Sequence, residues 1–296
     1  METKIDSNDA VIIIENLTKT YVGKKRTRVN ALKGISLQIN RGEIFGFLGP
    51  NGAGKSTTIK SLVGLVKPTS GKASILGESI PSVNSRRNLG YLPENPAFYD
   101  FLGAEEYLKF VGKAFKMSAT EIAKSSENIL KLLELWDARK RPIRGYSKGM
   151  VQRVGIAQTM IHDPEIYIFD EPMSGLDPIG RALVKDIMLD LKKKGKTVFF
   201  STHITDDVEK VCDRVGILFN GELKFIDTVE AVMTQGITGY LVKLKLSDGN
   251  IVDESVKKDE LNTFLYNHEK DGSEIILIEP QRKNLEEFFL SIVKAG

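Results

Sequence analysis

The sequence predicts an α/β fold: a P-loop-type core with a parallel sheet, an N-terminal antiparallel β subdomain, an α-helical insert and a small C-terminal α+β extension. Three observations support this prediction. A strand, a glycine-rich loop and a helix follow one another at residues 43–66, and the strand-sized runs EIYIF (165–169) and TVFF (197–200) are almost wholly apolar. Strands and a helix also recur after about Gly236. Continuous apolarity is typical of parallel strands that are covered on both faces.

The N-terminal segment, from Val11 to Ile39, has a β pattern. Its β-branched runs VIIIENLTKTY and ALKGISLQI are separated by turn signals, which predicts an antiparallel meander. The run GEIFGFLG then leads into the glycine-rich loop. The segment TTIKSLVGLV after that loop has apolar residues at helical spacing, at Ile59, Leu62, Val63 and Val66.

The middle of the chain, between about Ala104 and Ile161, has a helical pattern. Ser118 and Glu121 form an S-x-x-E capping box ahead of an amphipathic run. The apolar face of that run is expected to hold Ile122, Ile129, Leu132, Leu133 and Trp136. A further long helix is expected from about Pro178 to Lys194.

The C-terminal third begins with a hairpin, RVGILFNGELKFI (214–226), whose Asn220-Gly221 pair suits a type I′ turn. After it, YLVKLKL (240–246) and EIILIEP (274–280) are expected as strands and NLEEFFLSIV (284–293) as a helix, in a separate α+β unit. We therefore expect a main domain at residues 9–235, with its helical insert at about 95–163, and an accessory domain at 236–296.

The composition excludes several classes of protein. Lys and Arg number 42 against 39 Asp and Glu, a net charge of only +3, so no nucleic-acid partner is expected. The single cysteine, Cys212, favours a reducing compartment and suggests no zinc site. The N-terminus METKIDSNDA does not resemble a secretory signal, and no run approaches the roughly 20 apolar residues of a membrane-spanning helix. A membrane role would therefore require a partner.

Residues 49–57 read GPNGAGKST and match the pattern G-x-x-x-x-G-K-[ST]. The glycines let backbone N–H groups close around phosphate oxygens, Lys55 can reach the β- and γ-phosphates, and Ser56 can bind Mg²⁺. Because a strand precedes this loop and a helix follows it, the match predicts a P-loop that binds a nucleoside triphosphate. The residues expected to contact it are Gly49, Pro50, Asn51, Gly52, Ala53, Gly54, Lys55, Ser56 and Thr57.

Charged side chains follow two of the apolar strands: Asp170 and Glu171 after EIYIF, and His203 after TVFFST. In an open parallel sheet, ligands bind at the carboxyl ends of the strands, so these groups should share an edge with the P-loop. Asp170 could hold Mg²⁺ through its water shell, and Glu171 could take a proton from an attacking water. Singly, such residues are more often caps or core residues; their convergence predicts function. The isolated His162 and His268 are expected at the surface.

The segment YSKGM (146–150) predicts a second anion site. If a helix begins near Gly149, Ser147 and the nearby backbone N–H groups face an anion with the positive end of the helix dipole behind them. The segment lies on the helical insert rather than beside the P-loop, so it would serve a second ATP held by another subunit. An ordinary serine N-cap is the alternative.

The ordered set GPNGAGKST, YSKGMVQR (146–153), IYIFDEP (166–172), SGLD (174–177) and His203 closely resembles the ATP-binding subunits of ABC transporters, over about Val11 to Val229. In that family two subunits close head to tail around two ATP molecules, and each signature loop completes the phosphate site of the other subunit. The resemblance implies an ATPase with ATP and Mg²⁺ as cofactors, a second ATP-binding subunit, most simply an identical one, and a polytopic membrane permease. It also implies a place at the cytoplasmic face of the membrane.

The resemblance assigns roles to residues beyond the Walker A loop at 49–57. They are Tyr21 for stacking on adenine, Ser147 and Gly149 for the partner's γ-phosphate, Asp170 for Walker B, Glu171 as the catalytic carboxylate, Asp177 for the subunit-bridging loop and His203 for a γ-phosphate contact. For Tyr21 the alternative is an aromatic residue in the core of a strand.

Two residues depart from the usual family pattern. Lys148 stands where the signature usually has its first glycine, within Tyr146-Ser147-Lys148-Gly149-Met150. Glu94 stands where most members have a glutamine; its carboxylate could still approach Mg²⁺ or the attacking water, but it lacks the donor of an amide. Both departures resemble multidrug, sodium or polysaccharide exporters more than importers.

The segment NPAFYDF (95–101) offers an aromatic surface at Phe98, Tyr99 and Phe101. In the family this region docks the membrane subunit; the alternative is that the rings pack the helical insert. Another class of function is a soluble ABC-superfamily ATPase acting on ribosomes or DNA, but those proteins usually have two cassettes or a long coiled coil. A small GTPase or kinase is a third option, yet no N-K-x-D segment is present and YSKGM would have no role.

Overall fold

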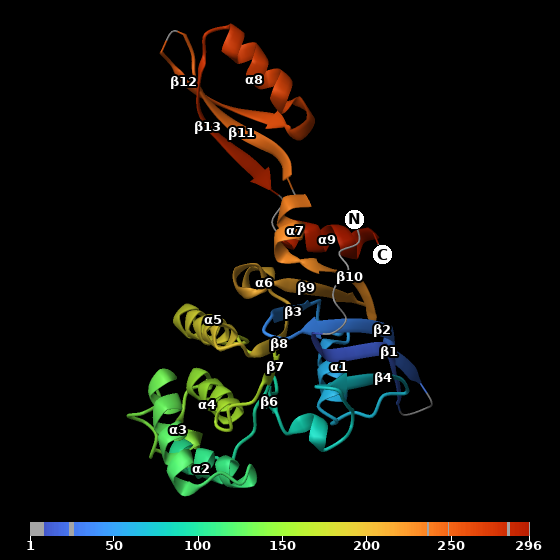
Figure 1. The fold of residues 1–296 in the computed structure, drawn as a ribbon, viewed down its shortest axis with the longest axis vertical. Helices are drawn as coiled ribbons and strands as arrows, with labels where there is room; N and C mark the ends of the chain where they lie inside the picture. The colour runs from blue at the N-terminus through green and yellow to red at the C-terminus, as the bar shows by residue number, and fades with distance from the viewer. Residues whose placement is uncertain (1–8, 24–26, 236, 248, 283–284, 296) are drawn as a thin grey trace. The chain divides into compact units, whose positions relative to one another are not determined.

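The computed structural model describes residues 9–23, 27–235, 237–247, 249–282 and 285–295 (Figure 1). The chain forms two compact units, Met1–Ile226 and Asp227–Gly296. The sequence places its boundary later in the chain, at residue 236. The first unit has two sheets and the second has one, and each unit has a core of its own.

A six-stranded sheet forms the centre of the first unit, in the order β10-β9-β3-β8-β7-β6. The neighbours β9-β3-β8-β7-β6 pair in parallel, and every residue of β3, β7 and β8 is buried, which confirms the parallel sheet predicted from the apolar runs. The strands are β3 (Ile44–Leu48), β6 (Leu89–Leu92), β7 (Ile166–Asp170), β8 (Thr197–Thr202), β9 (Arg214–Phe219) and β10 (Glu222–Thr228).

Several helices pack on this sheet. Helix α1 (Lys55–Leu62) contacts β7, and α4 (Lys148–Met160) contacts β6, whereas α5 (Pro178–Lys193) and α6 (Thr205–Val211) contact β8 and β3. The β9–β10 turn has positive φ at Asn220 (49°) and Gly221 (80°), as the predicted type I′ turn requires.

An antiparallel sheet, β2-β1-β4-β5, confirms the predicted N-terminal meander. Its strands are β1 (Ala10–Val22), β2 (Arg28–Asn40), β4 (Ser70–Ile75) and β5 (Glu78–Ser79), and the 3-10 helix Asn84–Arg86 follows. Its inner face shares one apolar core with β3 and α1, built from residues such as Ile12, Leu37, Phe47 and Ile59. The short strand β3, which carries the glycine-rich loop, is thereby anchored on both sides.

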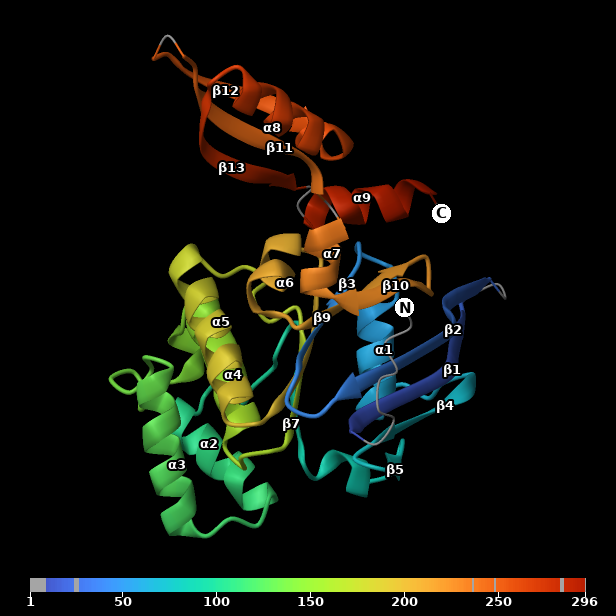
Figure 2. The same cartoon turned by 45° about the horizontal axis from the view of Figure 1, so that its top comes forward.

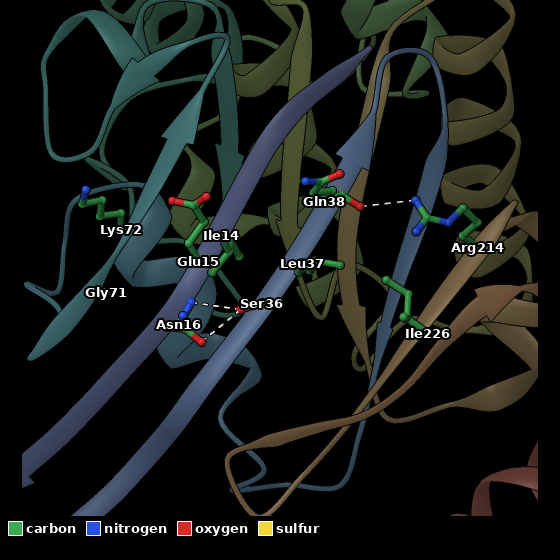
Figure 3. A pocket seen from close by; sticks show the side chains of 10 residues that line it. All are labelled: Ile14, Glu15, Asn16, Ser36, Leu37, Gln38, Gly71, Lys72, Arg214 and Ile226. Carbon is green, nitrogen blue, oxygen red and sulfur yellow. Dashed lines mark hydrogen bonds between the residues drawn. The ribbon is translucent and has the colours of Figure 1, made fainter. Parts of the chain in front are cut away.

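An open groove of about 760 Å³ lies on this β subdomain (Figure 3). Arg214 of β9 donates to Gln38 O at 3.2 Å and forms an ion pair with the buried Glu43, so it joins the antiparallel sheet to the central sheet. Burial raises the pKa of Glu43, although Arg214 opposes the shift. None of the predicted site residues lines this groove.

The predicted helical insert consists of α2 (Ala104–Ala114), α3 (Ala119–Leu132), the 3-10 helix Ile143–Gly145 and α4 (Lys148–Met160). The three α-helices contact one another and lie together in both views (Figures 1 and 2). The predicted capping box is present: Ser118 Oγ accepts from Glu121 N at 3.2 Å, and Glu121 Oε2 accepts from Ser118 N at 2.8 Å. These bonds lower the pKa of Glu121.

The predicted apolar face of α3 is correct at Ile122, Ile129 and Leu133, which are buried, and wrong at Leu132, which is 39% exposed. The helix ends at Leu132, and Glu134 with φ of 55° turns the chain away, so Leu132 lies outside the buried stripe. Trp136 is half-buried, with the guanidinium of Arg139 at 3.8 Å from its ring centroid.

Neither isolated histidine is a simple surface residue, so that expectation was wrong. His162 is half-buried and stacks on Phe115, with ring centroids 3.6 Å apart and planes at 8°. His268 is half-buried too, with Nδ1 at 3.1 Å from Phe264 O. Burial lowers the pKa of His162 from 6.5, because a charged imidazolium is disfavoured away from water.

This shift predicts how stability varies with pH. Below about 6.5 the unfolded chain binds a proton at His162 that the folded chain resists, so His162 should reduce the free energy of unfolding as pH falls through that value. Urea unfolding at about pH 7.5 and 5.5 measures the effect, and His162→Gln should flatten the dependence. His268→Gln is the matched control. An equal pH dependence in His162→Gln and the parent protein would contradict the assignment.

The second unit has a three-stranded antiparallel sheet, β12-β11-β13, with a small core of Val242, Leu244 and Val256. Its elements are α7 (Val229–Gln235), β11 (Ile237–Lys245), β12 (Ile251–Lys257), the 3-10 helix Lys258–Glu260, α8 (Leu261–Lys270), β13 (Glu274–Arg282) and α9 (Leu285–Ala295). The strands predicted at 240–246 and 274–280 and the C-terminal helix are confirmed. Within the described residues of both units, no helix is long and apolar enough to cross a membrane.

Candidate active site

The P-loop connects β3 to α1, as the sequence predicts. Gly54, with φ of 113°, precedes the helix, and Gly52 has φ of 81°, conformations that residues with a Cβ rarely adopt. A Cβ on Gly54 would also lie 2.6 Å from the carbonyl oxygen of Ala31 on β2. Both glycines are therefore required to bend the loop so that its backbone N–H groups and the start of α1 can face an anion.

Lys55 begins α1, yet its side chain is only 5% exposed. Its Nζ donates to Gly49 O at 2.7 Å and to Pro50 O at 3.3 Å, and it lies 3.2 Å from Glu171 Oε1 in an ion pair. The ammonium is thus fixed in the mouth of the loop, where it can meet phosphate oxygens.

Asp170, the last residue of β7, reaches the start of α1. Its Oδ1 accepts hydrogen bonds from Ser56 Oγ at 3.1 Å and from Ser201 Oγ at 2.6 Å. A carboxylate and a hydroxyl oxygen side by side fit Mg²⁺, which prefers oxygen ligands and keeps several waters. Tyr91 on β6 is nearby: burial and the charge of Asp170 raise its pKa to about 12, so its hydroxyl stays protonated.

Glu171 has an unusual backbone, with φ of 51° in a residue that is not glycine. Its N–H donates to Ser201 Oγ at 3.1 Å, which helps to hold that conformation. Its Oε2 lies 2.9 Å from His203 Nδ1, and its Oε1 is the oxygen paired with Lys55. Strain of this kind gathers at functional sites, and here it aims a buried carboxylate at the P-loop.

A cavity of about 300 Å³ brings most of the predicted residues together. It is lined by Ala31, Pro50, Asn51, Gly52, Gly54, Lys55, Ser56, Thr57, Glu94 and Glu171. Gly49 and Ala53 shape the loop from behind, since Gly49 N donates to Thr202 O and the Ala53 side chain is buried. His203 joins the site through its bond to Glu171. The arrangement can hold a triphosphate with a metal ion and place a base beside the terminal phosphate.

Other predicted residues do not line this cavity. Tyr21 lies on β1 with its ring 40% exposed and Lys19 Nζ at 4.9 Å from the ring centroid, so it is not a core aromatic residue. Ser147 caps α4, its Oγ accepting from Met150 N at 3.3 Å, and Gly149 follows in the first turn. Asp177 caps α5, with Oδ1 accepting from Gly180 N at 2.7 Å. The Ser147 bond is that of a serine N-cap, the alternative that the sequence left open.

Ser201 was not anticipated as a site residue. It is fully buried and joins Asp170 to the backbone of Glu171. The signal was a polar residue directly after the apolar run VFF of β8. The parallel register, which the sequence does not give, places Ser201 beside Asp170. Among the described residues there is no group of three or more His, Cys, Asp or Glu that could hold a metal.

Comparisons with known proteins show what this chain resembles. Residues 32–174 match the model of a family described as ABC transporter. An uncharacterized ABC transporter ATP-binding protein of Nostoc sp. (strain PCC 7120) is 39% identical over 96% of this chain and 90% of its own length. The linearmycin resistance ATP-binding protein of Bacillus subtilis is 33% identical, covering 94% of this chain and 96% of that one.

A solved structure gives the same result. The dimeric structure of a post-hydrolysis state of an ATP-binding cassette, bound to ADP and phosphate, is 27% identical, with a TM-score of 0.68 over 74% of this chain and 98% of that one.

Proposed function

This chain belongs to the family of ABC transporter ATP-binding subunits, ATPases that power transport as a dimer with a membrane partner, and on that premise we propose how its residues do so. The observation that carries the proposal is the convergence of Lys55, Asp170 and Glu171 on the P-loop cavity. Three strands and one helix hold these groups in place, so little reorganisation is needed when ATP enters.

In this proposal Lys55 binds the β- and γ-phosphates of ATP, exchanging its contact with Glu171 for phosphate oxygens. Ser56 and Asp170 would hold Mg²⁺, with Glu94 in the same cavity, and the ion would supply positive charge to the phosphates. Glu171 is the general base for that water. His203, which lies after β8 and contacts Glu171 Oε2, also contacts the γ-phosphate.

The remaining predicted residues serve the interface. Tyr21, exposed on β1, stacks on adenine. Ser147 and Gly149 bind the γ-phosphate of the ATP held by the second subunit, most simply an identical chain, with the N-terminus of α4 behind them. Asp177 bridges the two subunits at the start of α5. The positions of Ser147 and Asp177 support this proposal, because both cap helices and neither lines the P-loop cavity of its own subunit.

We propose export as the direction of transport. The departures at Lys148 and Glu94 resemble exporters, and the name of the Bacillus subtilis relative, a resistance ATP-binding protein, favours the same direction. ATP hydrolysis takes place at the cytoplasmic face of the membrane, where the permease binds the chain.

The permease is proposed to dock on an aromatic surface at Tyr99, Phe101 and Phe110, which are 55%, 64% and 52% exposed. Tyr99 packs against both phenylalanines, with centroids 6.1 and 5.6 Å apart, so the three rings form one patch. Phe98 is half-buried against Tyr107 and supports the patch from beneath rather than facing a partner. Exposed aromatic clusters of this kind are typical of binding hot spots.

A pull-down tests the proposed function. Tagged Glu171→Gln protein with ATP, purified from native membranes in mild detergent, should recover a polytopic membrane protein at stoichiometric yield. Adding Tyr99→Ser and Phe101→Ser should lower the yield at least about tenfold, because hot-spot aromatics each contribute on the order of 2 kcal/mol. Tyr266→Ser, an equally exposed aromatic of the C-terminal unit, is the control. Recovery of ribosomal or DNA-bound partners without a membrane protein would instead favour the soluble branch of the superfamily.

A further inference from the structure

The loop from Glu171 to Asp177 is fastened to helix α4 at more than one point. Gln152 of α4 is buried and donates its Nε2 to Pro172 O at 3.0 Å, directly after Glu171. Near the other end of the loop, the Leu176 side chain lies at 3.6 Å from where a Cβ on Gly149 would be, an ordinary packing distance. Both ends of the loop therefore follow the position of α4.

Lys148 adds a third contact, at Gly175. That glycine has φ of 69°, and a Cβ there would lie 2.2 Å from Lys148 Nζ and 2.6 Å from Cε. The end of this exposed lysine side chain thus lies over the bare Cα of Gly175, and a Cβ there would displace it. Within the described ranges no ion pair is recorded for the Lys148 ammonium, and a cation in the first turn of a helix opposes the dipole. Helix stability does not explain this lysine, whereas the contact with Gly175 does.

We propose that Lys148 is a positioning residue, whose stem, together with Gln152, locks the loop 171–177 to the signature helix α4. The inference rests on the proposed function, in which Ser147 and Gly149 bind the partner's ATP and Glu171 hydrolyses the ATP of its own subunit. The lock makes these two groups one rigid body. Binding of ATP by the partner then sets the position of Glu171 through α4, so hydrolysis at the two sites is coupled.

Lys148→Ala and Lys148→Met separate this role from an electrostatic one. Methionine keeps a stem as far as the position of Cε but has no charge. For Lys148→Ala we expect a kcat roughly tenfold lower, since a small misplacement of a catalytic group is costly. Its Hill coefficient for ATP should fall toward one, while ATP affinity of the monomer stays within about twofold. Lys148→Met should retain the kcat and cooperativity of the parent protein.

A double-mutant cycle with Gly175→Ala tests the contact itself. An alanine at position 175 is strained by the positive φ whether or not Lys148 is present, so the effect of this strain on kcat cancels in the cycle. The clash with the lysine does not cancel, so Gly175→Ala should lower kcat at least about threefold more in the parent protein than in Lys148→Ala. ATP-dependent dimerisation in light scattering and steady-state hydrolysis are the two readouts.

Three results would overturn the proposal. The first is that Lys148→Ala keeps the kcat and Hill coefficient of the parent protein. The second is that the effects of Lys148→Ala and Gly175→Ala on kcat are additive. Either result would show that the contact does not position the loop. Lys148→Met could behave like Lys148→Ala with activity more sensitive to salt, which would assign the ammonium to a phosphate instead. If the parent protein itself neither hydrolyses ATP nor dimerises with it, the proposed function fails together with this inference, and that outcome is visible before any variant is made.

Discussion

Replacing Glu171 with glutamine should slow ATP hydrolysis at least about 10²-fold while leaving ATP binding intact, because loss of a general base typically costs that much. The amide keeps the size of the carboxylate and its place after β7, but it cannot take a proton from water. Lys55 keeps its bonds to Gly49 O and Pro50 O, so the phosphate site survives the change. Steady-state hydrolysis and binding of a fluorescent ATP analogue measure the two effects.

The same variant should accumulate as an ATP-bound dimer, since closure no longer leads to hydrolysis. Glu165→Gln is the matched control: this exposed carboxylate lies just before β7, far along the strand from Glu171, and is paired with Arg41 at 2.7 Å. It should hydrolyse ATP at the rate of the parent protein. Unchanged ATP turnover in Glu171→Gln would show that Glu171 is not the general base.

Ser147→Arg should abolish ATP-dependent dimerisation and reduce hydrolysis to near the background rate, while the monomer binds ATP as before. The reason is position: Ser147 caps α4 and does not line the cavity that holds the P-loop. An arginine there would project into the surface that meets the second subunit and displace its phosphate contacts. Light scattering of the Glu171→Gln background with ATP measures the dimer.

A second capping serine provides the control for that experiment. Ser118 caps α3 with the same kind of bond to the third backbone N–H of its helix. Ser118→Arg loses a cap as Ser147→Arg does, at a cost of about 1 kcal/mol of stability, but it should leave the dimer intact. An ATP-dependent dimer that persists in Ser147→Arg would falsify the cross-subunit role.

The central sheet and the P-loop could be predicted because their signals are local. Apolar runs specify covered parallel strands, and polar residues at the strand ends must then share one edge. Strand ends alone therefore predict that Lys55, Asp170 and Glu171 lie together; Lys55 and Glu171 line one cavity, and Asp170 is bonded to Ser56 of that cavity. In open parallel sheets the ligand-binding residues lie at the carboxyl ends of the strands, which the sequence marks as the points where the apolar runs stop.

Features that depend on tertiary contacts could not be predicted in this way. The positive φ of Glu171 and the role of Ser201 arise from the pairing of β7 with β8, and no single segment contains both. Leu132 fits the helical period but lies at a helix end, where the chain turns. In the second unit, β12 and α8 were missed, because IVDESVK and LNTFLYNHEK have few apolar residues and only a weak period.

The measurement that tests the central claim most directly is a cross-link between the P-loop and the signature segment. Asn51 lines the cavity, and a Cβ on Gly145, next to the signature, would meet nothing closer than 3.9 Å, so both positions accept cysteine. The experiment uses the Asn51→Cys, Gly145→Cys variant in a Cys212→Ala, Glu171→Gln background. With ATP, a short bismaleimide should convert this variant to a covalent dimer. No covalent dimer should form when ADP replaces ATP, or when either cysteine is present alone. A cross-linked monomer, or a dimer that forms equally without ATP, would contradict the account.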